Sequence, residues 1–143
     1  MTSVVNERFE QIRKTVDSTP AKKLTETLIG QGLTSAEILE AMFAMYRESF
    51  SPERALGEHG KFEFCISTPD GPISYALSVD DGTCAIGPGT SPDATSVISM
   101  SLSDFLRLSL GKANGAMLAM TGRIKVKGDT VAAMSIRDWF PTE

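Results

Sequence analysis

The sequence predicts an α+β fold, in which helices cover one face of a sheet of five strands. Apolar residues recur at helical spacing in the first and last parts of the chain. In between, they alternate with polar residues, and turn pairs such as Asp70-Gly71 and Asp81-Gly82 separate the alternating segments. A length of 143 residues is typical of one domain.

The composition excludes several classes of protein. A formal net charge of −4 argues against a general nucleic-acid binder and against strong attraction to anionic membranes. No apolar run approaches the roughly 20 residues that span a bilayer, and the N-terminus is too polar for a secretion signal. Cys65 and Cys84 lie in predicted strands without a spacing motif, so we interpret them as reduced, buried side chains, although a disulfide stays open. We expect a soluble cytoplasmic protein with no nucleic-acid partner and no integral membrane segment.

The N-terminal residues predict a helical extension. One apolar stripe of a helix over residues 4–18 consists of Val5, Phe9, Ile12 and Val16. Pro20 ends this helix and opens a second one. We predict an extension over residues 1–33 and a main domain over residues 34–143. The stripe is expected to pack on that domain or on another chain, so residues 1–33 are a candidate contact for a second copy or a partner enzyme.

A third helix and five strands follow. Thr34 and Glu37 have the spacing of a capping box. The apolar face behind them consists of Ile38, Leu39, Met42, Met45, Tyr46 and Phe50. Strands are predicted over 61–67, 73–79, 82–86, 97–102 and 123–127. One side of each hairpin is apolar and the other is small or polar, which is typical of a sheet covered on one face.

Three short helices are predicted in the last third of the chain. Ser101 or Ser103 caps the first, Asn114 the second and Asp129 the third. They carry more large apolar side chains, several of them Met, than covering one sheet requires. Methionine is flexible and polarisable, and suits a site that fits several apolar shapes. We interpret these helices as walls of an apolar cavity for a lipid-like ligand; the alternative is that their side chains only fill a core.

Several motifs occur together in this order. They are Phe-Ser-Pro-Glu-Arg-Ala (50–55), Pro-Asp-Ala-Thr (92–95), Ser-Asp-Phe-Leu (103–106), Gly-Lys-Ala-Asn (111–114) and Gly-Arg-Ile-Lys-Val-Lys-Gly-Asp (122–129). With these motifs, residues 35–140 resemble the sterol-carrier-protein type 2 family of lipid-binding domains. Residues 1–33 have no counterpart in the minimal family domain, and the family's C-terminal extension, which can carry a peroxisomal signal, is not seen here.

The resemblance implies a mixed, mostly antiparallel five-stranded sheet, with helices on one face enclosing an apolar cavity. It implies non-catalytic binding or transfer of a fatty acid, an acyl-CoA, a sterol or another lipid-like metabolite, with no cofactor. The side chains expected to line the cavity are Phe64, Tyr75, Phe105, Leu108, Met117, Met120, Met134 and Trp139.

Two other functions stay open: an interaction module that presents a hydrophobic substrate within a larger enzyme system, and an enzyme that uses the same cavity. We expect no catalytic or metal site. His59 has no Cys or paired carboxylates beside it, and no G-x-S-x-G nucleophile motif occurs. The row Arg123, Lys125 and Lys127 could meet an acidic head group or a membrane surface, but lysines on an edge strand also discourage strand pairing.

Overall fold

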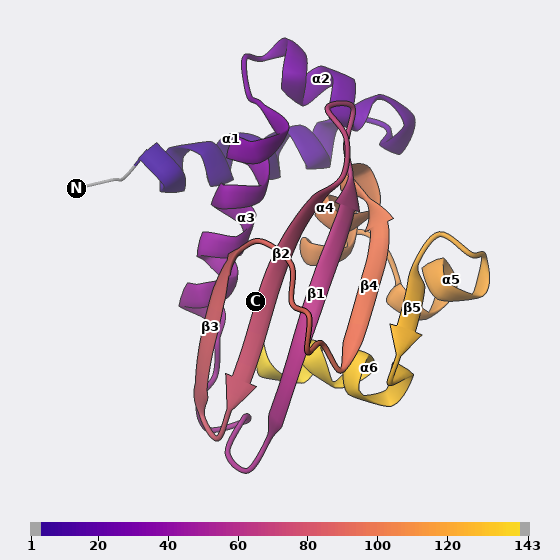
Figure 1. Cartoon of the computed structure of the whole chain (residues 1–143). Helices are drawn as coiled ribbons and strands as arrows, with labels where there is room; N and C mark the ends of the chain where they lie inside the picture. Colours follow the sequence, from indigo (N-terminus) through magenta and orange to yellow (C-terminus); the bar gives the residue numbers. More distant parts are fainter. Residues whose placement is uncertain (1–3, 141–143) are drawn as a thin grey trace.

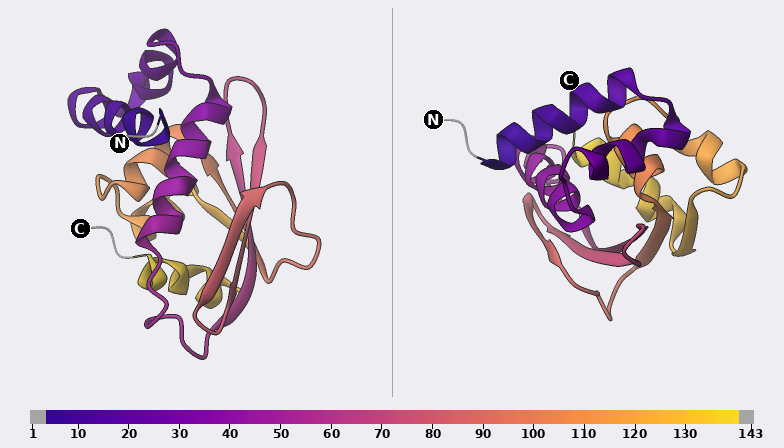
Figure 2. Two further views of the ribbon diagram at one scale, coloured as in Figure 1. Left: turned by 90° about the vertical axis from the view of Figure 1, so that its left-hand side faces the viewer. Right: turned by 90° about the horizontal axis from the view of Figure 1, so that it is seen from above.

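The predicted strands form one sheet, in which neighbours follow the order β3-β2-β1-β4-β5. The computed structural model describes residues 4–140, with side chains from residue 6 onward. β1 and β4 are parallel, and all other neighbouring strands are antiparallel. The helices lie on one side of the sheet (Figures 1 and 2). The predicted α+β fold with a mixed, mostly antiparallel sheet is confirmed.

The strands are β1 (His59–Ser67), β2 (Ile73–Asp80), β3 (Thr83–Pro88), β4 (Ser96–Ser101) and β5 (Lys125–Gly128). The helices are α1 (Val4–Ser18), α2 (Leu24–Gly30), α3 (Ser35–Ser49), α4 (Leu102–Ser109), α5 (Gly115–Met120) and α6 (Thr130–Trp139), with a short 3-10 helix η1 (Ala21–Lys23) before α2. The predicted start of the fifth strand was wrong. Arg123 lies in the turn before β5, because its N–H donates to the Leu118 carbonyl at 2.8 Å and closes α5.

The side of the sheet that faces the helices is apolar and buried. Phe62, Leu77 and Ile98, on three different strands, are between 0% and 6% exposed. Glu63 and Ser78, their neighbours along β1 and β2, are only partly buried. Successive residues of a strand point to opposite faces, so a covering layer is needed only on the apolar side. The predicted sheet with one covered face is therefore confirmed.

The first two α-helices pack on the rest of this chain. The side chains of Ile12, Leu24 and Leu28 are fully buried in the same apolar cluster as the sheet. An ion pair of 2.8 Å joins Asp17 of α1 to Lys112, beyond the end of α4. Figure 2 shows α1 and α2 lying over the end of α3 and α4. Ile12 and Val16 of the apolar stripe are thus covered by this chain itself, and Phe9 is partly buried.

The division of the chain into an extension over residues 1–33 and a domain over residues 34–143 stays a prediction. The side chain of Val5, the first member of the predicted stripe, lies outside the described residues.

Side-chain caps begin the four helices for which they were predicted. The Glu37 N–H donates to Thr34 Oγ1 at 3.1 Å, and the Thr34 N–H donates to Glu37 Oε1 at 3.0 Å, which confirms the capping box. That second hydrogen bond holds the pKa of Glu37 below its ordinary value. Of the two predicted alternatives for α4, Ser101 is the cap. Asn114 and Asp129 cap α5 and α6.

Gly128 connects β5 to α6 at a place where no side chain fits. Its φ is +96°, in the left-handed region. A Cβ at this position would collide with the carbonyl oxygen of Thr95, just before β4. The N–H of Asp129 donates to the same carbonyl at 3.1 Å. The carboxylate of Asp129 caps α6. This close approach of two backbone segments fixes where α6 begins relative to β4.

We predict that Gly128→Ala destabilises the protein more than Gly32→Ala does. Both glycines have φ +96°, but nothing lies within 4 Å of a Cβ built at Gly32. The left-handed conformation alone should cost about 1–2 kcal/mol at either position. The collision with Thr95 should add about 1–3 kcal/mol to Gly128→Ala alone. Urea unfolding measures both values, and equal losses would show that the approach to Thr95 is not restrictive.

Candidate ligand-binding cavity

A cavity of about 610 Å³ lies between the inner face of the sheet and the helices. Each strand contributes an apolar side chain to its floor; these are Phe64, Leu77, Ile86, Ile98 and Val126. Pockets that hold small organic ligands have volumes of about 300–1,000 Å³. An apolar molecule that fits a cavity of this volume could therefore cover part of the apolar face of the sheet.

α3 and α4 supply an aromatic wall. Phe43 is 2% exposed and stacks on Tyr75 of β2 and Phe105 of α4, with ring centroids 4.2 and 5.1 Å away. One turn further along α3, Tyr46 meets Phe140 edge-on at 5.4 Å. Such aromatic pairs contribute about 0.5–1.5 kcal/mol each beyond the burial of their area. The cluster therefore fixes this wall of the cavity relative to the sheet.

α5 borders the cavity with small residues, and its buried side chain is Leu118. Gly115, Ala116 and Ala119 line the cavity, whereas Met117 and Met120 are 59% and 81% exposed. On a helix, residues i, i+1 and i+4 lie within about 100° of one another, and residues i+2 and i+5 lie outside that sector. The cavity thus owes this part of its volume to the absence of large side chains.

The cavity opens between α5 and α6. The lining residues that are also exposed to solvent are Asn114, Ala116, Ala119, Thr130, Met134, Arg137 and Asp138. Met134 is 57% exposed, and Val131 on the same helix is 76% exposed. An apolar ligand that enters here meets apolar side chains at the entrance before it reaches the floor.

One polar contact lies inside the cavity. Tyr46 of α3 and Ser109 of α4 both line it, and their hydroxyl oxygens are 2.7 Å apart. Burial raises the pKa of the Tyr46 phenol, and the hydrogen bond with Ser109 opposes part of that shift. The phenol is therefore protonated at neutral pH and can both donate and accept a hydrogen bond.

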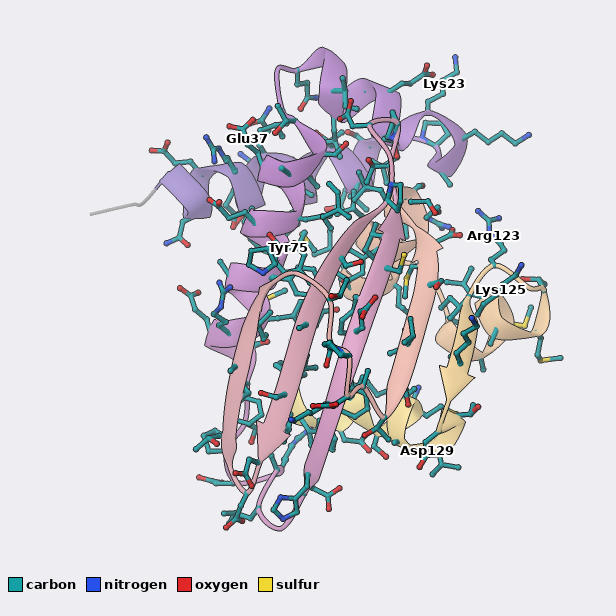
Figure 3. The ribbon with its side chains drawn as sticks, in the orientation of Figure 1. Lys23, Glu37, Tyr75, Arg123, Lys125 and Asp129 are labelled. Carbon is teal, nitrogen blue, oxygen red and sulfur yellow. The ribbon has the colours of Figure 1, made fainter. Side chains whose placement is uncertain are left out.

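An ion pair between a buried carboxylate and an exposed guanidinium holds α4 to the turn before β5. The side chain of Asp104 is 4% exposed, and its two oxygens accept from Nε and Nη2 of Arg123 at 3.0 and 2.9 Å. This paired geometry satisfies both carboxylate oxygens. Figure 3 shows Arg123 and Lys125 on the β5 side of the sheet. Within the part of the chain that the structure describes, Arg123 is the member of the predicted cationic row that forms an ion pair.

The structure brings four of the eight predicted cavity residues into the lining, namely Phe64, Phe105, Leu108 and Met134. The other four, Tyr75, Met117, Met120 and Trp139, do not line it. Tyr75 is covered by Phe43, and Trp139 is 3% exposed and packs against Phe62 at 5.9 Å. The two methionines face solvent because of the phase of α5. Contact of any of these eight residues with a ligand stays a prediction.

Several lining residues were overlooked by the sequence-based prediction. Leu77 alternates with polar neighbours along the strand predicted over 73–79, and that alternation was a signal that could have placed it on the cavity floor. No face was predicted for Ile98, although its strand was. Phe43 follows Leu39 by four residues on α3, which also indicates an inward position. Ala119 gave no such signal, because a small residue has little hydrophobic weight even where it creates a cavity.

Residues 4–140 were also compared with the requirements of a metal site and of a membrane span, and they meet neither. No group of three or more His, Cys, Asp or Glu side chains there could hold a metal ion. The His59 Nδ1 lies 2.8 Å from the Asp80 carboxylate, but both side chains are largely exposed and neither lines the cavity. None of the helices in this described range has the length and apolar character that crossing a membrane requires.

The family comparison covers most of the chain. The model of the SCP-2 sterol transfer family matches residues 43–141. Hydroxysteroid dehydrogenase-like protein 2 of Mus musculus is 27% identical over 99 residues, which are 68% of this chain and 20% of that protein. Its Xenopus laevis counterpart is 28% identical over 102 residues, 71% of this chain and 24% of that protein. The chain thus spans about a fifth to a quarter of the length of these curated relatives.

Solved structures share the fold. The apo form of sterol carrier protein 2 from Yarrowia lipolytica has a TM-score of 0.54 and 24% identity, and the match covers 70% of this chain and 92% of that one. A palmitated sterol carrier protein 2-like protein from Aedes aegypti has a TM-score of 0.57 and 17% identity, covering 67% and 88%. A sec-alkylsulfatase from Pseudomonas sp. has a TM-score of 0.64 and 15% identity, covering 80% of this chain and 17% of that one.

We predict that Arg123→Met lowers the free energy of unfolding by roughly 2–3 kcal/mol, because it leaves the buried Asp104 carboxylate without its charged partner. Lys125→Met is the matched control. It removes a cation from an exposed position two residues away and should change stability by less than about 0.5 kcal/mol.

The double variant Arg123→Met/Asp104→Leu should recover part of the loss, because both polar partners are then gone. Urea unfolding measures all three variants. Equal losses for Arg123→Met and Lys125→Met would contradict the anchoring role of the ion pair.

Proposed function

Because the chain belongs to the SCP-2 sterol transfer family, we propose that its cavity binds a hydrophobic ligand and shields it from water without catalysing a reaction. The ligand class in this proposal is a fatty acid, an acyl-CoA, a sterol or a similar lipid-like metabolite. The observation that carries the proposal is the cavity of about 610 Å³ with an apolar side chain from every strand.

The hydrophobic effect alone gives a useful affinity. Removing one methylene group from water contributes about 0.8 kcal/mol. About ten buried methylenes would therefore contribute about 8 kcal/mol, the free energy of a micromolar complex before ordering costs are subtracted. Phe43, Leu77 and Ile98, which line the cavity, are held by the core at no more than 6% exposure. A cavity whose wall and floor are already ordered reduces those costs.

The palmitated relative from Aedes aegypti supports a single acyl chain as one ligand that this fold can hold. The match there is at 17% identity and therefore speaks for the fold alone.

A second candidate is presentation of a hydrophobic substrate to an enzyme. The relatives in Mus musculus and Xenopus laevis are several times longer than this chain, and so is the sec-alkylsulfatase of similar fold. A domain of this kind therefore recurs as one part of larger proteins. In this proposal, residues 1–33 contact a second copy or a partner enzyme. Ile12 and Leu24 are buried within this chain, so such a partner would meet the polar outer face of these helices.

We predict that Ala119→Trp weakens binding of a fluorescent fatty acid by at least about tenfold. Ala119 lines the cavity near its opening, and an indole at this position would occupy space that the ligand needs. Met120→Trp is the matched control, because Met120 is the next residue, is 81% exposed and does not line the cavity. Its affinity should stay within about twofold of wild type. Equal weakening by both variants would instead support Met120 as the cavity residue.

Native mass spectrometry of the purified protein tests binding without a choice of ligand beforehand. We expect a lipid-sized adduct that organic extraction removes, and extraction should leave the fold intact. Two negative results together would contradict ligand binding: no adduct on the purified protein, and no displacement of the fluorescent probe by a fatty acid or a sterol. They would leave only the contact of residues 1–33 with a second copy or a partner enzyme.

A further inference from the structure

The Tyr46–Ser109 contact is a polar point inside an apolar cavity. The two hydroxyl oxygens are 2.7 Å apart and come from helices that are distant in sequence. Ser109 is 3% exposed, and the Tyr46 ring lies among Phe43, Phe105 and Phe140, with centroid separations of 5.8, 6.1 and 5.4 Å. The pair is therefore set in the aromatic wall, with Ser109 buried and Tyr46 partly buried.

The hydrogen count of this pair leaves one donor over. Each hydroxyl carries one hydrogen, and the contact between the two oxygens uses one of these two hydrogens. Whichever hydroxyl donates, the other one keeps a hydrogen that has no acceptor among the residues that the structure describes. Buried polar groups are normally hydrogen-bonded, and an unmade bond costs free energy. The remaining hydrogen and the free lone pairs are thus available to a molecule in the cavity.

The surroundings select the charge of that molecule. The aromatic rings give a low local dielectric, which disfavours an ionised group that has no opposite charge beside it. Arg137 and Asp138 line the cavity, but both are exposed at its opening. Because burial raises the pKa of Tyr46, the phenol itself stays a neutral donor at physiological pH. A neutral oxygen suits this position better than a carboxylate.

We propose that the Tyr46 and Ser109 hydroxyls bind a neutral oxygen of the ligand, such as an alcohol, a ketone or an ester carbonyl. The inference rests on the proposed function, since it requires an apolar ligand in the cavity. It makes the site selective: the hydroxyl pair recognises one oxygen, and the apolar floor takes up the hydrocarbon part.

The experiment compares dodecanol, dodecane and dodecanoate in competition with a neutral fluorescent naphthylamine probe. The proteins are wild type, Tyr46→Phe, Ser109→Ala and the double variant. In the double variant, the affinity for dodecanol should fall roughly three- to tenfold, because a hydrogen bond inside a protein is worth about this much. The affinity for dodecane should stay within about twofold of wild type. Each single variant leaves one hydroxyl and should give a smaller loss.

Tyr75→Phe is the matched control. Tyr75 is the other of the two tyrosines in the chain, stacks on Phe43 and does not line the cavity. Its removal of a phenol oxygen should leave all three affinities unchanged. Urea unfolding of each variant separates a loss of binding from a loss of folding.

The outcomes distinguish recognition of an oxygen by the hydroxyl pair from binding of an apolar ligand in the cavity. Equal weakening of dodecanol and dodecane in the double variant would mean that the pair only supports the wall, and this would overturn the inference while leaving ligand binding intact. Dodecanoate binding that is tighter than that of dodecanol and is lost in the double variant would overturn the preference for a neutral oxygen. Displacement of the probe by none of the three compounds would contradict the proposed function itself.

Discussion

The apolar inner face of the sheet is the constraint on which the rest of the structure depends. Residues such as Phe62, Leu77 and Ile98 must be kept from water, and each fully buried side chain of this kind contributes about 1.5–3 kcal/mol. The helices cover this face closely at α3 and α4, where Phe43 stacks on Tyr75 of β2 and on Phe105 of α4. Near α5 and α6 they cover it incompletely, and the cavity of about 610 Å³ is the consequence. The same face of the sheet that drives folding is thus the surface offered to a ligand.

A cavity persists only if its walls are held in place by contacts outside it. Arg123 ties the turn before β5 to the buried Asp104 at the start of α4. Gly128 allows the backbone before α6 to approach Thr95 too closely for any side chain. The N-terminal helices cover the far side of α3 and α4, with Ile12 fully buried. These contacts hold α4, the turn before β5 and the start of α6 in place around the cavity.

The sequence was informative about the fold wherever the hydrophobic pattern had a clear period. The alternation along residues 73–79 located β2 and its buried face, and the capping residues Thr34, Asn114 and Asp129 located the helix starts. The cavity was harder to predict, because a large apolar side chain does not have to line a cavity and a small one can. Met117 and Met120 were predicted to line the cavity because they are large and apolar, but both are exposed to solvent. Their neighbours Ala116 and Ala119 line the cavity. The pairing of Arg123 with Asp104 joins residues from two elements, and neither periodicity nor local spacing encodes it.

The central claim is that an apolar molecule occupies the space above the sheet. Intermolecular nuclear Overhauser effects between a bound fatty acid or alcohol and methyl-labelled protein test it most directly. The account predicts contacts from the ligand chain to the methyl groups of Leu77, Ile98 and Val126, which lie on three strands of the cavity floor. Contacts confined to the exposed methyl groups of Met117 and Met120, with none to the floor, would contradict it.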